Sequence, residues 1–247
     1  MLQINKSDKL NVQAIISQLM QRKQRTTVPR FRLPYTTEQV YTMLYASCYT
    51  EVSCRHRQFH ADSAYIHHLQ DIAKWLTDTE SPTFGVFLCG NRGNGKTTIV
   101  RALQSLVFWL RSDERPLVTD PDIPMGYNPG FEIVTAKELV RLAKAYNNPT
   151  RDNQQDYARY KRILNIEILA IDDLGVEPSQ SMNYGDYVTA AKDILSHRYE
   201  HQFTTIATSN LAPNEIKEYY DERIADRFRE MMLIIDFGNE PSFRPTN

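Results

Sequence analysis

The chain has 247 residues, which is enough for one large domain or for a medium domain with a small appendage. Hydrophobic residues make up 41% of the sequence and aromatic residues 11%, so a substantial core can form. No apolar run approaches the roughly 18 residues that a membrane span needs. The first residues, MLQINKSDKLNVQ, lack the pattern of a signal peptide. We therefore expect a cytoplasmic protein with no membrane partner.

The net charge of −1 does not indicate that the chain as a whole binds nucleic acid. The charge is uneven, however, because residues 1–37 carry a net +6 and leave −7 for the remainder. A basic arm on an acidic body is typical of contact with nucleic acid or an acidic partner; the alternative is a solvated helix end and linker. The sparse cysteines are typical of a reducing compartment rather than of a disulfide scaffold (Cys48, Cys54 and Cys89).

Two helices are predicted near the N-terminus. The first covers residues 8–24, where apolar residues recur on one stripe (Val12, Ile15, Ile16, Leu19 and Met20). The segment TTVPRFRLPY interrupts it with two prolines. Thr36, followed by Gln39 three residues later, is typical of a capping box that opens the second helix. We divide the chain after residue 61 and expect residues 1–61 to form a helical region, with a basic arm, that binds a partner or DNA.

From about Asp62 the pattern changes: a helix over 62–78 is followed by short apolar runs that alternate with longer helical patterns. The expected strands cover 84–89, 131–136, 166–172, 203–209 and 233–238. The expected helices cover 96–111, 136–147, 152–164, 184–201 and 213–230. This alternation predicts an α/β fold with a parallel five-stranded sheet flanked by helices. Residues 112–130, with four prolines and four acidic residues, are typical of a functional or disordered loop.

A glycine-rich motif, GNRGNGKT, follows the first of these strands and opens the next helix. It matches G-x-x-x-x-G-K-[ST] in the strand–loop–helix setting that this phosphate-binding motif requires. The glycines allow successive backbone N–H groups to converge on a phosphate, and the helix N-terminus adds partial positive charge. Lys96 would reach the β- and γ-phosphates of ATP, and Thr97 would ligate Mg²⁺. The expected nucleotide-binding residues are Gly90, Asn91, Arg92, Gly93, Asn94, Gly95, Lys96, Thr97 and Thr98.

Two adjacent carboxylates end the strand in ILAIDDLGVE. An isolated pair of acids beside an aliphatic run is costly, so a cation is expected there. Asp172 would hold the Mg²⁺ that bridges the phosphates, and Asp173 would polarise the attacking water. Because aspartate is shorter than the glutamate common at the second position, Glu177 is the expected assistant. The structural alternative for Asp173 is an acid that caps the loop.

Two further strand or helix ends supply candidate catalytic residues. TTIATSN ends with Ser209 and Asn210, which could touch the γ-phosphate or the water; the alternative is a simple turn before Pro213. Arg223 and Arg227 lie four residues apart on one helix. A neighbouring subunit could present this helix as an arginine finger, whereas the alternative is pairing with glutamates on a solvated surface.

Taken together, GNRGNGKTT, TAKELVRLAKAY, ILAIDDLGVE, TTIATSN and RIADRFRE resemble the bacterial DnaC/DnaI helicase loaders in order and approximate spacing. The IstB-type ATPases of transposons are close kin, and both belong to the AAA+ (ASCE) class of P-loop NTPases. The resemblance covers about residues 62–247 and implies that they form an AAA+ ATPase domain. It also implies a protein of DNA replication that loads a replicative helicase onto single-stranded DNA.

The resemblance assigns further roles. Asn210 would be the sensor-I residue, and Arg227 the better arginine-finger candidate with Arg223 beside it. A paired aspartate is common in this family, so Asp173 is compatible with ATP hydrolysis. The resemblance also implies an ATP-bridged oligomer of the chain and no C-terminal helical lid.

Three other hypotheses remain open. The chain could be an IstB-like helper whose partner is a transposase, or an adaptor that binds ATP with little hydrolysis, as Asp173 in place of glutamate would allow. A zinc site is the third, built from neighbouring residues whose spacing does not match a C-x2-4-C knuckle; helix packing and surface histidines are its alternative (Cys48, Cys54, His56 and His60).

Overall fold

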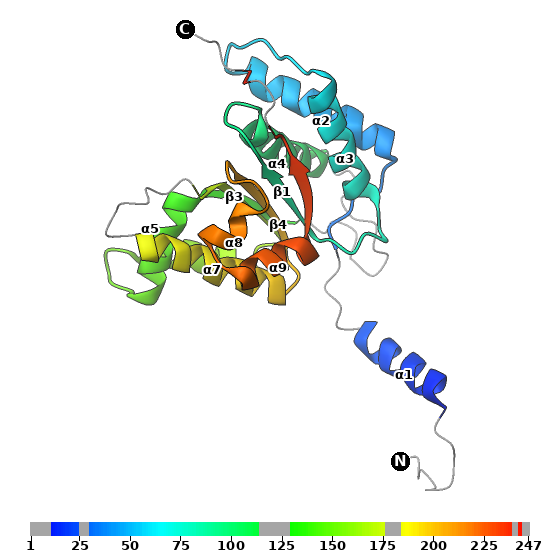
Figure 1. Cartoon of the computed structure of the whole chain (residues 1–247), viewed down its shortest axis with the longest axis vertical. Helices are drawn as coiled ribbons and strands as arrows, with labels where there is room; N and C mark the ends of the chain where they lie inside the picture. Colours follow the sequence, from blue (N-terminus) through cyan, green and yellow to red (C-terminus); the bar gives the residue numbers. More distant parts are fainter. Residues whose placement is uncertain (1–10, 25–29, 114–128, 176–183, 239–241, 244–247) are drawn as a thin grey trace, which may run out of the picture.

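The computed structural model describes residues 11–24, 30–113, 129–175, 184–238 and 242–243. Five strands form one sheet at its centre in the order β2–β3–β4–β1–β5 (Figure 1). The strands are β1 (Gly85–Cys89), β2 (Phe131–Thr135), β3 (Ile168–Leu174), β4 (Thr204–Ser209) and β5 (Met232–Asp236). All neighbouring pairs are parallel, so the predicted five-stranded parallel sheet is confirmed.

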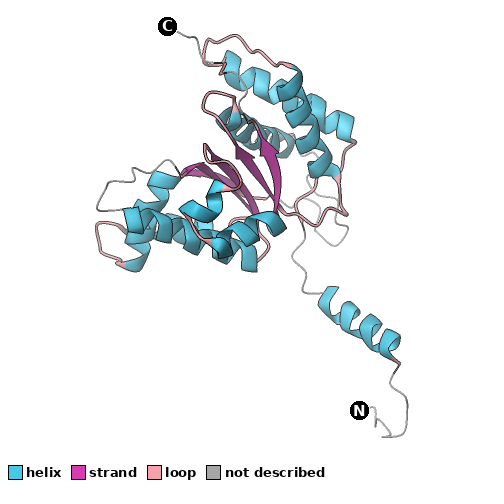
Figure 2. Cartoon of the chain, viewed as in Figure 1, coloured by secondary structure: helices cyan, strands magenta, loops and turns pink. Residues whose placement is uncertain are grey.

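Helices cover both faces of this sheet, which makes a three-layer α/β structure (Figure 2). One apolar cluster unites the sheet with α2 (Thr37–Ser53), α3 (Ser63–Thr77) and α4 (Lys96–Ser112). The other cluster unites it with α5 (Ala136–Asn147), α6 (Gln154–Asn165), α7 (Tyr184–Glu200), α8 (Glu215–Tyr219) and α9 (Glu222–Met231). The predicted helices and strands match these bounds to within about two residues, apart from the differences described below.

The interior strand β1 shows why helices must cover both faces of the sheet. All five of its residues are buried. Because side chains alternate across a strand, Val86 and Leu88 face the α2–α4 layer, whereas Phe87 and Cys89 face the α5–α9 layer. A strand that is apolar on both faces is stable only between two layers of helices.

The N-terminal helix α1 (Val12–Gln24) stands apart from this body (Figure 1). Its start is fixed by Asn11, whose Oδ1 accepts hydrogen bonds from the N–H groups of Gln13 and Ala14. The predicted helix began at residue 8, and residues 8–10 lie outside the described part of the chain. The apolar stripe of α1 is exposed to solvent (Val12, Ile15, Ile16, Leu19 and Met20). No helix in the described ranges is long and apolar enough to cross a membrane.

Helix α2 belongs to the core. The predicted capping box opens it, because Gln39 N–H donates to Thr36 Oγ1 and Thr36 N–H donates to Gln39 Oε1. Val40, Leu44 and Cys48 are completely buried against α3 and α4. The division after residue 61 therefore runs between two helices that share one core.

Two charges counted in the basic arm bind the body instead. Arg32 is 1% exposed, its Nε donates to the Asp78 carbonyl at 2.7 Å, and its guanidinium lies 4.4 Å from the ring centre of Trp75. Burial lowers its pKa to about 10. Arg30 donates to the carbonyl of Ser81 at 2.6 Å. These two arginines, which the charge count of residues 1–37 included, fasten the entering chain to the turn after α3.

The single helix predicted over 213–230 is wrong, because the chain breaks it into α8 and α9. Asp221 stands between them in an extended conformation and accepts the N–H of Ile224 at 2.8 Å. The Lys192 ammonium lies 2.7 Å from the same carboxylate. These two hydrogen bonds lower the pKa of Asp221. An aspartate that starts a new helix is a capping residue, and periodicity alone does not distinguish it from an exposed helical residue.

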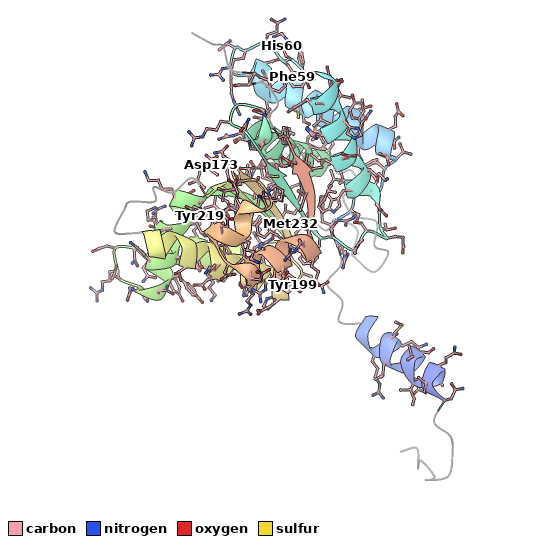
Figure 3. The ribbon with its side chains drawn as sticks, in the orientation of Figure 1. Phe59, His60, Asp173, Tyr199, Tyr219 and Met232 are labelled. Carbon is pink, nitrogen blue, oxygen red and sulfur yellow. The ribbon has the colours of Figure 1, made fainter. Side chains whose placement is uncertain are left out.

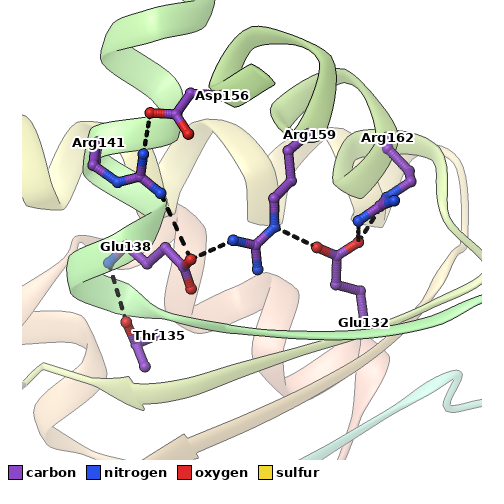
Figure 4. A network of polar contacts seen from close by, with 7 residues as sticks. All are labelled: Glu132, Thr135, Glu138, Arg141, Asp156, Arg159 and Arg162. Carbon is purple, nitrogen blue, oxygen red and sulfur yellow. Dashed lines mark hydrogen bonds and ion pairs between the residues drawn. The ribbon is translucent and has the colours of Figure 1, made fainter. Parts of the chain in front are cut away.

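A surface network of ion pairs joins α5, α6 and β2 (Figure 4). Arg159 bonds to Glu132 at 2.6 Å and also to Glu138, while Arg162 lies 2.7 Å from Glu132. The hydrogen bonds that Arg159 donates, first to Glu132 and then to Glu138, raise the pKa of its guanidinium group. Because Arg162 is well exposed, its pair contributes little to stability.

A buried arginine, by contrast, binds backbone groups where β3 and β4 begin. Arg198, near the end of α7, is 0% exposed. It donates to the carbonyls of Ile166 at 2.9 Å and Thr204 at 2.7 Å, and to Thr205 Oγ1 at 2.9 Å. Burial lowers its pKa to about 9. One side chain thus satisfies backbone groups that begin β3 and β4.

We expect Arg198→Met to lower the free energy of unfolding by about 3 kcal/mol or more, because several buried carbonyls lose their donor. Arg162→Met is the matched control and should cost less than about 1 kcal/mol, because its pair is exposed. Urea unfolding of the three proteins measures both changes. Equal losses in the two variants would contradict this assignment.

Candidate nucleotide-binding site

A cavity of about 740 Å³ opens where β1, β3 and β4 end, at the carboxyl edge of the sheet. Ligands of open α/β sheets bind at this edge because the loops there are free to adapt. The cavity brings together many of the predicted residues (Arg92, Gly93, Asn94, Gly95, Lys96, Thr97, Thr98, Asp173 and Asn210).

The phosphate-binding loop depends on its glycines. Gly90, Gly93 and Gly95 have φ angles of 108°, 89° and 87°, which residues with a side chain rarely adopt. A Cβ atom at Gly95 would also lie 2.8 Å from the Tyr65 ring. The loop then opens α4, so backbone N–H groups and the helix N-terminus face the same space. The arrangement fits a phosphate chain.

Lys96 lies at the base of this loop and is 7% exposed. Its Nζ donates to the carbonyls of Gly90 at 2.7 Å and Asn91 at 2.5 Å. These carbonyls hold the ammonium group at the loop, where a bound anion would be a further acceptor. Gly90 and Asn91 thereby contribute through their backbones.

A hydroxyl and carboxylate cluster lies beside the loop. Thr97 Oγ1 donates to Asp172 Oδ1 at 3.0 Å, and Thr208 Oγ1 donates to the same oxygen at 2.6 Å. Hard oxygen ligands of this kind suit Mg²⁺, which keeps several waters and binds few protein groups. The described residues contain no cluster of three or more acidic, histidine or cysteine ligands, so a metal here would depend on Thr97, Asp172, phosphate and water. Sequence reasoning missed Thr208, because only Ser209 and Asn210 of the TTIATSN motif were considered as site residues.

The backbone of Asp173 is left-handed, with φ of 62°, and this explains why the residue is an aspartate rather than a glutamate. Its N–H donates to Thr208 Oγ1 at 2.9 Å, where the pairing of β3 with β4 is irregular. Aspartate tolerates the left-handed region better than glutamate does. Figure 3 labels Asp173 at the carboxyl end of β3, beside the cavity that it lines. The predicted assistant Glu177 lies outside the described residues and stays a prediction.

Ser209 and Asn210, two neighbouring polar residues at the end of β4, have different surroundings. Ser209 is buried; its hydroxyl donates to the Leu174 carbonyl at 2.5 Å and accepts from Leu211 N–H at 3.0 Å. Its side chain therefore shapes the turn. Asn210 lines the cavity with Asp173, where a side chain can reach the end of a phosphate chain.

Comparison of the sequence with family models and with curated proteins gives no match. The structure is similar to the DnaC helicase loader, with a TM-score of 0.51 and 19% identity over 72% of this chain and 93% of that one. It is also similar to DnaI (TM-score 0.49, 21% identity, 72% and 87% covered) and to AMPPCP-bound DnaA from Aquifex aeolicus (TM-score 0.48, 14% identity, 73% and 49% covered). The chain has the fold of AAA+ P-loop NTPases.

In this AAA+ fold the two candidate finger arginines differ in exposure, although both lie on α9 near Glu200. Arg227 is 10% exposed at its side chain, donates to Glu200 at 3.0 Å and lies 4.9 Å from the Tyr199 ring centre. Arg223 is 73% exposed and lies 3.8 Å from Glu200. Neither is among the residues that line the cavity. Both remain predictions as fingers, and Arg223 is the more accessible.

Sequence reasoning missed the end of the cavity that lies away from Lys96, Thr97 and Asp173. It is lined by the loop between α2 and α3 and by the C-terminal segment (Val52, Arg55, Arg57, Gln58, Phe59, His60, Tyr65 and Phe243). No spacing rule marks these residues, because they approach the phosphate-binding loop only after folding.

The zinc hypothesis is wrong, because the described residues, which include Cys48, Cys54, His56 and His60, contain no group of three or more ligands that could hold a metal ion. Cys48 is buried, and the Tyr65 hydroxyl donates to its Sγ at 3.7 Å. Burial raises the pKa of the Cys48 thiol to about 12, which disfavours the thiolate that a metal needs. The cysteine is a packing residue in the core.

We expect Asp173→Glu to lower the free energy of unfolding by about 1 kcal/mol, because the longer side chain is less compatible with a left-handed backbone. Asp173→Asn should leave stability nearly unchanged, since asparagine tolerates the same conformation. Thermal and urea unfolding without nucleotide measure this. A glutamate variant as stable as wild type would contradict the backbone explanation.

Proposed function

We propose that the chain is an ATP-hydrolysing AAA+ protein of DNA replication that loads a replicative helicase onto single-stranded DNA in the cytoplasm. The observation that carries the proposal is the single cavity shared by the phosphate-binding loop, Asp173 and Asn210. The sequence motifs of helicase loaders and the similarity of fold to DnaC support the specific role.

In this proposal, protein groups contact both the bound phosphates and the attacking water. The loop N–H groups and Lys96 would bind the phosphates, and Thr97 with Asp172 would hold the metal ion. Bound Mg²⁺ would neutralise charge on the β- and γ-phosphates. Asp173 accepts a proton from the attacking water, and Asn210 orients that water or the γ-phosphate.

Hydrolysis in this proposal requires a second copy of the chain. The cavity lining contains Arg55, Arg57 and Arg92 but no arginine from α9. Arg223 is exposed and could enter the cavity of a neighbour. Arg227 would first have to leave Glu200 and Tyr199. ATP would therefore lie between subunits, and assembly would control its turnover.

The N-terminal segment is the proposed partner-binding part. Helix α1 exposes an apolar stripe that stands away from the body. Such a stripe fits the groove of a partner protein by the helix-in-groove mode. The flanking basic residues Arg22, Lys23 and Arg25 would contact single-stranded DNA or acidic side chains.

Wild-type protein should hydrolyse ATP in the presence of single-stranded DNA, whereas Lys96→Ala and Arg223→Ala should each lose on the order of a thousandfold in turnover. Mixing the two inactive variants should restore part of the activity, because an intact Lys96 meets an intact Arg223 at some interfaces. Steady-state phosphate release measures all four samples.

Arg229→Ala is the matched control, since Arg229 lies on the same helix and pairs with Asp226 within its own chain. It should keep normal turnover. If wild type and Lys96→Ala turn over at the same rate, hydrolysis is excluded and the adaptor hypothesis is favoured.

The partner proposal predicts that Leu19→Asp on α1 abolishes ATP-dependent capture of a purified replicative helicase, with no change in hydrolysis. Gln21→Asp places the same charge on the opposite face of the helix and should retain capture. Pull-down with both variants measures this. Capture of a transposase but no helicase by wild type would instead support the transposition role.

A further inference from the structure

The segment after β5 returns to the phosphate-binding loop. Phe237 N–H donates to the carbonyl of Cys89 at 2.9 Å, and Asn91 N–H donates to the carbonyl of Gly238 at 3.2 Å. Phe243 N–H then donates to the carbonyl of Gly93 at 3.1 Å. Phe243 and Gly238, which follow β5, are thus hydrogen-bonded to the loop that would hold the phosphates.

The ring of Phe243 takes part in an aromatic unit at the far end of the cavity. Its centre lies 5.6 Å from that of Tyr65, and the planes are perpendicular. Phe59 lies 6.0 Å from Tyr65 on another edge. Tyr65 is 1% exposed and so supports the other two rings, which are only partly buried. Edge-to-face contacts of this kind fix the orientation of aromatic rings.

Phe243 borders the cavity without filling it. The volume of about 740 Å³ remains with the ring in place, which lies within the range of small-molecule sites. Lys96, Thr97 and Asp173 occupy the phosphate end, so the aromatic unit lies where the other part of a nucleotide must go.

We propose that Phe243, supported by Tyr65 in the same aromatic unit as Phe59, is the stacking wall for a purine base of the bound nucleotide. This inference rests on the proposed ATP site and adds the residue that selects its base. A purine offers a larger face than a pyrimidine, so a site built on stacking favours ATP over CTP. The hydrogen bond from Phe243 N–H to the Gly93 carbonyl links the proposed stacking residue directly to the phosphate-binding loop.

Phe243→Ala should weaken ATP binding about tenfold, because stacking on an aromatic ring contributes on this scale. CTP should be affected less, and inorganic tripolyphosphate, which has no base, should bind as it does to wild type. Phe243→Tyr should restore ATP affinity. Calorimetry with the full-length proteins measures all three ligands.

Phe108→Ala is the matched control, because Phe108 is also partly exposed but lines no part of this cavity. If Phe243→Ala binds ATP as tightly as wild type, base stacking on Phe243 is overturned. Binding of ATP by the wild type would still support the ATP site itself. Equal losses for ATP and tripolyphosphate would assign Phe243 to loop support instead and overturn base stacking. Tighter ATP binding in the variant would show that the ring obstructs the site. If wild type binds none of the three ligands, the proposed function itself fails.

Discussion

Asp172 is only 6% exposed, and a carboxylate so deeply placed is tolerated only when hydrogen bonds or a cation stabilise its charge. Thr97 from the start of α4 and Thr208 from β4 both donate to its Oδ1. This one oxygen therefore joins the helix that follows the phosphate loop to two central strands. Lys96 and Asp173 directly precede and follow two members of that junction, Thr97 and Asp172, in the chain.

Thr208 extends the same junction to the second acid. Its hydroxyl donates to Asp172 and accepts the N–H of Asp173, so one oxygen fixes both acids. The chain can meet both demands only by turning into the left-handed region at Asp173. This constraint gives a conformational reason for an aspartate at that position, independent of its reach toward a water molecule.

The glycine-rich motif and the alternation of apolar strands with helices made the phosphate end predictable, because both signals are local in the chain. Tertiary contacts decided the rest. In the sequence, Arg32 is only one more positive charge, whereas in the structure Trp75 and the turn after α3 enclose it. Asp221 reads as part of a helix until Lys192 pairs with it. Neither contact partner can be inferred from a nearby spacing.

The far end of the cavity escaped prediction for a topological reason. The loop containing Phe59 precedes β1, and Phe243 follows β5, so the two residues are far apart in the sequence. Because β1 and β5 are parallel neighbours, the chain that leaves β5 emerges beside the loop that leaves β1. Helices α2 and α3 pack on each other, and α2 packs on α4, which brings the Phe59 loop to the same place. The middle of the chain thus supplies the phosphate end of the cavity, while segments near its two ends supply the other. A force on α2 or on the C-terminal segment consequently acts on groups that contact the phosphate loop directly, and this is a physical route by which a bound partner could alter nucleotide affinity.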